Sequence, residues 1–132
     1  ARFPMPVAFA LNGHTYAGGA IMASAGDIRF MRADRGRFCF PEVNIKVPFT
    51  PLMTEVVRLL PNSAGAWEMM STGVAWGGEE AVAKGVIEHA LSAEALLPAA
   101  MAWATEMAKK DRATYTLIKR RFRVALDVYL PK

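Results

Sequence analysis

The sequence has few of the residues that hold small disulfide-bonded or metal-binding domains together. It contains one cysteine, Cys39, and two histidines, His14 and His89. A single cysteine excludes an intrachain disulfide, and the three residues leave no plausible zinc ligand set, so we expect no metal site. No apolar run reaches the ~18–20 residues that a membrane-spanning helix needs, so we expect no membrane span. The chain begins without a methionine, a basic region or a cleavable apolar stretch, which predicts no signal peptide.

The composition is that of a folded domain with a real core. Of the 132 residues, 53% are hydrophobic and 21% are charged, which excludes a disordered chain. The length suffices for one domain and is too short for two. The eight prolines and ten glycines fall at predicted element boundaries and form no linker. We therefore expect a single domain.

The net charge of +4 is unevenly distributed. Residues 1–100 carry eight Lys and Arg against nine Asp and Glu, whereas residues 101–132 carry eight against three. The positive excess thus lies in the last quarter of the chain. A solvated helix face and the attraction of an anionic ligand are both compatible with it. No nucleic-acid-binding motif accompanies these residues, so we do not expect a nucleic-acid partner.

The order of predicted elements indicates an α/β core followed by helices. Wholly apolar or alternating runs predict strands at 7–11, 27–31, 37–40 and 86–87, with a glycine-containing loop at 13–19. Helical periodicity or capping residues predict helices at 20–25, 52–60, 62–70, 79–84, 92–110 and 111–128. Asn62 or Ser63 and then Ser92 are the expected N-caps. Strands mixed with helices, then helices alone, favour an α/β domain with a helical C-terminal extension.

Three segments in order carry a family resemblance. They are the apolar run with Asn-Gly and then Gly-Gly at 6–20, Ala-Gly-Asp-Ile-Arg at 25–29, and Arg-Phe-Cys-Phe-Pro-Glu-Val at 37–43. This pattern resembles the crotonase superfamily, the enoyl-CoA hydratase/isomerase family. The resemblance implies part of a ClpP/crotonase spiral β/α core over residues 1–91 and a helical oligomerisation region over 92–132. Family members are longer, and the chain resembles their C-terminal half. It is therefore expected to be a fragment whose absent half holds the second oxyanion donor and much of the CoA pocket.

The resemblance implies two catalytic groups. The first is the backbone N–H of Gly18, with Gly19 as its neighbour, which would stabilise a thioester enolate at a helix N-terminus. The alternative is that the glycine pair only permits close helix–strand packing. The second is Glu42, in the Pro-Glu loop, which would act as the acid/base. Hydratases of the family carry another glutamate three residues after the oxyanion glycine, and that position here is Ile21.

The pattern of one retained glutamate, Glu42, and one lost glutamate, at Ile21, resembles that of the Δ3,Δ2-enoyl-CoA isomerases. The Pro-Phe pair ending at Phe49 supports this assignment, and Thr50 argues against the dienoyl-CoA isomerases, which place an acid there. The implied reaction shifts a 3-enoyl-CoA double bond to the 2-position. A hydratase or another crotonase reaction is the first alternative, and a non-catalytic acyl-CoA-binding member is the second.

Further expectations follow from the same resemblance. Tyr16, Gly19, Pro41 and Phe49 would contact the substrate. No cofactor is expected, because coenzyme A is part of the substrate. The C-terminal cations would attract CoA phosphates, a solvated helix face being the alternative. The protein would form a homotrimer or hexamer, in the cytoplasm or, in a eukaryote, the peroxisome.

Overall fold

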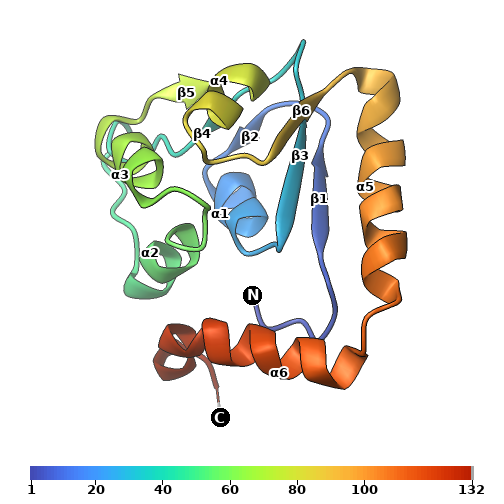
Figure 1. Ribbon diagram of the computed structural model, residues 1–132. Coiled ribbons are helices and arrows are strands. Elements are labelled where there is room, and N and C mark those ends of the chain that lie inside the picture. The colour runs from blue at the N-terminus through green and yellow to red at the C-terminus, as the bar shows by residue number, and fades with distance from the viewer. Residues whose placement is uncertain (132) are drawn as a thin grey trace.

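Two small sheets organise the computed structural model, which describes residues 1–131 (Figure 1). The first sheet has the order β1-β3-β6 and is parallel throughout. Its strands are β1 (Ala8–Leu11), β3 (Ile28–Arg32) and β6 (His89–Leu91). The second sheet has the order β2-β4-β5, and its strands are β2 (Thr15–Tyr16), β4 (Phe38–Cys39) and β5 (Ala75–Trp76). Strand β4 pairs with β2 in parallel and with β5 in the antiparallel direction.

Six α-helices and one 3₁₀-helix complete the described residues. They are α1 (Gly18–Ser24), α2 (Pro51–Val57), α3 (Ser63–Thr72), α4 (Gly78–Ala83), α5 (Ala93–Ala108), α6 (Arg112–Phe122) and the 3₁₀-helix η1 (Val124–Tyr129). The predicted N-caps Asn62 and Ser92 accept hydrogen bonds from the Ala64 and Ala95 N–H groups. None of these helices is both long enough and apolar enough to cross a membrane.

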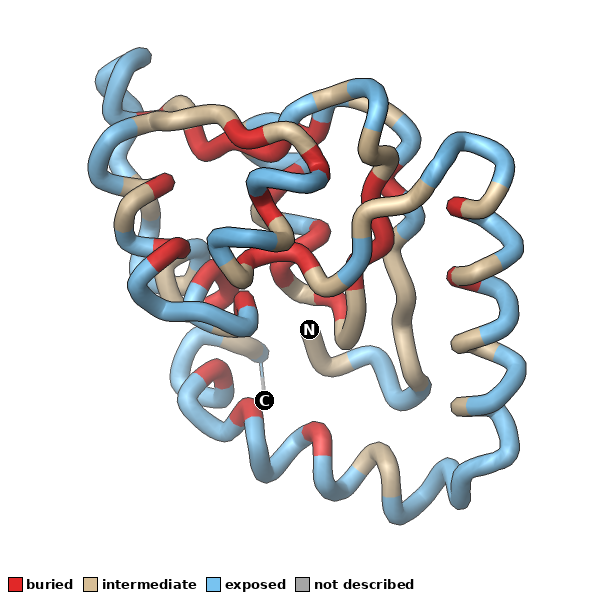
Figure 2. Tube along the Cα trace, turned by 45° about the horizontal axis from the view of Figure 1, so that its top comes forward, coloured by how far each residue is buried: buried red, intermediate tan, exposed pale blue. Residues whose placement is uncertain are grey.

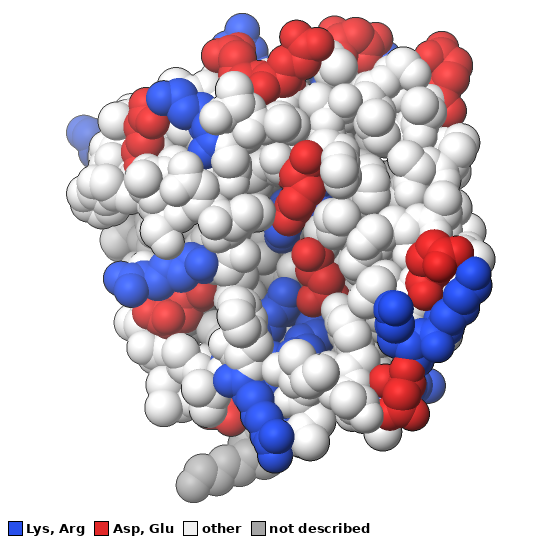
Figure 3. All heavy atoms as spheres, in the orientation of Figure 1, with Lys and Arg blue, Asp and Glu red and all other residues white. Residues whose placement is uncertain are grey.

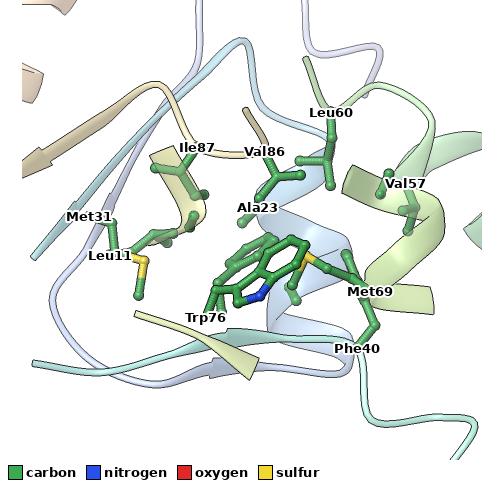
Figure 4. Close-up of a cluster of buried hydrophobic side chains, with 14 residues drawn as sticks. Leu11, Ala23, Met31, Phe40, Val57, Leu60, Met69, Trp76, Val86 and Ile87 are labelled. Carbon is green, nitrogen blue, oxygen red and sulfur yellow. The ribbon is translucent and has the colours of Figure 1, made fainter. Parts of the chain in front are cut away.

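Helix α1 lies inside the core, between the sheets and helices α2 and α3 (Figures 1 and 4). Its buried side chains are small, and Ala20 and Ala23 are fully enclosed. Larger residues close around it, among them Met31, Phe40 and Met69. A second cluster lies under α5, whose inner face is covered and whose outer face is exposed (Figure 2). These layers hold α1 and the ends of β2 and β4 in fixed positions.

The α/β core and the helical extension are confirmed, with local differences. The predicted strand at 86–87 is wrong: Val86 and Ile87 are buried in a turn, and the strand begins at His89. The predicted last helix ends earlier, at Phe122, where the chain tightens into η1. Strands β2 and β5 were not predicted. Oligomerisation through residues 92–132 stays a prediction.

Two of the C-terminal cations fit neither role expected for them. Lys119 and Arg123 are buried and form ion pairs of 2.7 and 2.9 Å with Asp27, at the start of β3. They are structural groups, because burial removes them from solvent and from a distant ligand alike. On the face in Figure 3, Lys and Arg side chains are scattered among uncharged residues, several of them next to Asp or Glu, and form no continuous basic surface.

Candidate active site

The glycine turn and the Pro-Glu loop leave the same edge of the second sheet. Strands β2 and β4 are parallel and pair Tyr16 with Cys39. The Ala17 N–H donates to the Cys39 carbonyl oxygen at 3.1 Å, which extends the ladder past the last paired residues. Gly18 follows two residues after Tyr16, and Pro41 follows two residues after Cys39. Because the carboxyl ends of parallel strands meet at one edge, the two predicted catalytic segments start side by side.

Helix α1 begins with backbone donors that its own hydrogen bonds do not use. The first helical hydrogen bond runs from the Ile21 N–H to the Ala17 oxygen at 2.9 Å, so the N–H groups of Gly18 and Gly19 precede it. Both glycines are exposed, and a Cβ atom added at either would meet nothing within 4 Å. The turn therefore presents open space next to donors at the positive end of a helix.

Ala17, which precedes these donors, has a strained backbone. Its φ of 50° and ψ of −120° lie in a region that L-residues rarely adopt. The hydrogen bond to Cys39 and the one accepted from Ile21 hold it there. Sequence reasoning missed this residue, since a single alanine before Gly-Gly carries no signal of its conformation.

Glu42 is a buried carboxylate with an unused oxygen. The residue is 6% exposed, and no group among residues 1–131 hydrogen-bonds to its Oε2 atom. Its carbonyl oxygen accepts from the Val47 N–H at 3.0 Å, which closes the loop around it. Burial raises the pKa of the neighbouring Cys39 thiol, and the charge of Glu42 raises it further. A buried acceptor without a partner is unusual and is a mark of functional sites.

Several apolar residues lie in the loop that carries Glu42. Phe49 packs edge-to-face on Phe40 with ring centroids 6.0 Å apart, and it covers part of the core. The alternate residues Val43, Ile45 and Val47 are exposed along the loop. The loop thus combines a buried carboxylate with an apolar rim formed by Val43, Ile45 and Val47.

The predicted site residues fall into two groups. Gly18, Gly19, Pro41 and Glu42 gather at the edge of the second sheet. Tyr16 is on β2 and is 41% exposed, and Phe49 is half-buried and packs against the core. Their contact with a substrate stays a prediction. The described residues contain no cluster of three or more His, Cys, Asp or Glu that could hold a metal ion.

Comparison with known proteins decides the family. The profile described as "Enoyl-CoA hydratase/isomerase" matches residues 1–132. The chain belongs to the enoyl-CoA hydratase/isomerase family. A crystal structure of an enoyl-CoA hydratase from Mycobacterium ulcerans Agy99 superposes with a TM-score of 0.84 at 26% identity, over 95% of this chain and 54% of that one. The fold is therefore crotonase-like, as the resemblance implied.

Two curated relatives from Arabidopsis thaliana are described as isomerases. The chain is 36% identical to enoyl-CoA delta isomerase 3 over 81% of its own length and 46% of the relative's. It is 40% identical to enoyl-CoA delta isomerase 2, peroxisomal, over 66% of its length and 37% of the relative's. The chain thus spans less than half the length of these relatives of the enoyl-CoA hydratase/isomerase family.

Proposed function

We propose that the complete protein moves the double bond of a 3-enoyl-CoA to the 2-position, with Glu42 as the only acid/base. The observation that carries this proposal is the buried Glu42 Oε2 atom, which is unpartnered among the described residues and belongs to a loop that leaves the same edge of the second sheet as the Gly18 turn. The two isomerase relatives support it.

The proposed reaction needs one group that takes and returns a proton. Glu42 removes a proton from C2 of the substrate, and the electron pair moves onto the thioester oxygen. The Gly18 N–H stabilises this enolate, whose charge develops only during the reaction. Protonated Glu42 then gives the proton to C4, so the double bond moves from C3–C4 to C2–C3 and the carboxylate is restored. No cofactor is needed, because coenzyme A is part of the substrate.

The side chain at position 21 favours isomerisation over hydration. Addition of water requires a second group that positions and activates it, and Ile21 cannot transfer a proton. Ile21 is half-buried and packs against the core, so it contributes only apolar surface. The apolar rim of the Glu42 loop disfavours ordered water in the same way.

Hydration is the second candidate, because the Mycobacterium ulcerans structure that matches the fold is a hydratase. Incubating the complete protein with 3-enoyl-CoA and, separately, with 2-enoyl-CoA distinguishes the candidates. We expect the 3-enoyl-CoA to isomerise without change of mass and the 2-enoyl-CoA to gain no water. Gain of one water by the 2-enoyl-CoA would favour the hydratase, and no turnover of either would favour a non-catalytic acyl-CoA-binding protein.

We also propose assembly as a trimer or hexamer through the C-terminal helices. The exposed apolar residues Ile118, Phe122 and Val128 support this proposal. The peroxisomal relative supports a peroxisomal location in a eukaryotic host.

A further inference from the structure

Two buried arginines converge on the C-terminal end of helix α1. Arg29, on β3, is 2% exposed and donates to the Ala23 oxygen at 3.1 Å. Arg123, which follows α6, is 8% exposed and donates to the oxygen of Ala25, the C-cap of α1, at 2.9 Å and to that of the next residue, Gly26, at 2.8 Å. It also donates to the Ala1 oxygen at 2.9 Å. The carbonyl groups at a helix end have no partners within the helix, and positive charge there is favourable. Helix α1 has no basic residue in its own last turn, so other elements supply both charges.

These contacts add to the restraints on the position of helix α1. It has seven residues, and its fully enclosed side chains are only Ala20, Ala23 and Ser24. The close-packed core holds these small side chains, and the hydrogen bonds at the C-terminal end add a directional restraint along the helix axis. Because a seven-residue helix is only about 10 Å long and stiff, a shift at one end moves the other end as well.

The two arginines are held differently. Arg29 forms a two-point ion pair with Glu88, and its Nε donates to that carboxylate at 3.0 Å. This pair belongs to the core. Arg123 comes from the opposite end of the chain and is oriented by Asp27, which it meets at 2.9 Å. Its guanidinium therefore ties the C-terminal helical region to the helix that begins with Gly18.

We propose that Arg123 is a positioning residue, which keeps the Gly18 N–H aimed at the substrate by fixing the far end of α1. The proposal rests on the proposed function, because it assumes that this N–H stabilises the enolate. It assigns the C-terminal region a part in catalysis besides any part in assembly. Arg123 does not touch the substrate and acts only through α1.

Lys119 provides a matched control. Its Nζ donates to Asp27 Oδ2 at 2.7 Å and to the Met5 oxygen at 2.9 Å, so it anchors α6 to the same carboxylate without a hydrogen bond to α1. Arg123→Lys keeps the charge and loses the planar guanidinium, which donates to three carbonyl oxygens and a carboxylate together. Lys119→Met removes one anchor of α6 and leaves the α1 contacts in place.

Both variants are made in the complete protein and assayed at a temperature where circular dichroism shows them folded. We expect Arg123→Lys to lower kcat about tenfold with KM little changed, since misplacing a catalytic group by a fraction of an ångström has effects of this order. Lys119→Met should lower Tm and leave kcat near that of the wild type. An equal loss of kcat in both variants, or no loss in Arg123→Lys, would overturn the proposal.

Amide hydrogen exchange of the segment 17–24 supplies a readout that does not depend on turnover. We expect faster exchange there in Arg123→Lys than in Lys119→Met. If the wild type fails to isomerise 3-enoyl-CoA, the proposed function fails while the exchange comparison still tests the positioning. Equal exchange in the two variants would mean that Arg123 only anchors α6.

Discussion

The Ala17 N–H and the Cys39 carbonyl oxygen form a 3.1 Å hydrogen bond that joins the two halves of the site. Ala17 is the last residue before α1, and Cys39 is the last residue of β4. The bond fixes where the Gly18 donor begins relative to the loop that carries Glu42. It also holds Ala17 in its strained backbone conformation, so the geometry of the edge is set before any ligand binds.

The first prediction concerns the proton-transfer group. Glu42→Gln keeps the size and shape of the side chain and removes its basicity, so we expect isomerase activity to fall about 10²–10⁴-fold. Because Oε2 has no protein partner among residues 1–131, the amide should be accommodated with little change in Tm. The control is Glu79→Gln, the same change at an exposed position. Full activity in Glu42→Gln would remove this residue from the mechanism.

The second prediction concerns the open space at the glycine turn. A Cβ at Gly18 meets no protein atom within 4 Å, so Gly18→Ala should fold normally. Its methyl group would enter the space that the thioester must occupy, and we expect a cost of about 1–3 kcal/mol in kcat/KM. Gly13→Ala is the matched control, because a Cβ there also meets nothing within 4 Å. Equal activity in the two variants would place the substrate elsewhere.

The sequence predicted the larger elements because they have readable signals. The apolar run of β1 and the capping side chains of Asn62 and Ser92 correspond to local physical causes. Strands β2 and β5 have two residues each, too few to show an alternating pattern. The β-branched pair Val86-Ile87 favours a strand by composition, yet tertiary packing places it in a buried turn.

The functional residues likewise include some that the sequence could identify and some contacts that it could not. Gly18 and Glu42 could be named because both lie in a motif that resembles a known family. The burial of Lys119 and Arg123 could not, because their partner Asp27 lies 92 and 96 residues away. A sequence shows cations on one helix, whereas only the fold shows which carboxylate they meet.

The third prediction concerns the turn between β3 and β4. Gly36 has a φ of +87°, and a Cβ there would collide with the backbone of Gly13, whose Cα would lie 2.9 Å away. Gly36→Ala therefore combines an unfavourable backbone conformation with a clash against an atom that cannot rotate aside. We expect a loss of about 2 kcal/mol or more in the free energy of unfolding, measured in urea. Gly13 lies on the other side of this contact, but a Cβ added there meets nothing within 4 Å. Gly13→Ala should therefore stay near wild-type stability. Equal stability of the two variants would contradict the geometry of this turn.

The last prediction concerns the pH dependence of stability and Tyr115, which lies on α6 near the ion pairs of Asp27 with Lys119 and Arg123. Burial, and then the Asp27 carboxylate, raise the pKa of Tyr115 from 10.0 to about 12. Between these values the folded protein keeps the phenol proton and the unfolded chain has lost it. Folding then binds a proton, so the stability from this group is complete below pH 10 and is lost as pH rises toward 12.

The comparison of wild type with Tyr115→Phe isolates the contribution of this one phenol. The difference in tyrosinate absorbance between the two proteins should appear near pH 12. The free energy of unfolding should fall more steeply with pH in the wild type than in Tyr115→Phe over the interval from 10 to 12. A difference absorbance that appears near pH 10, with parallel stability curves, would mean that Tyr115 is solvated and that α6 does not lie against Asp27 as described.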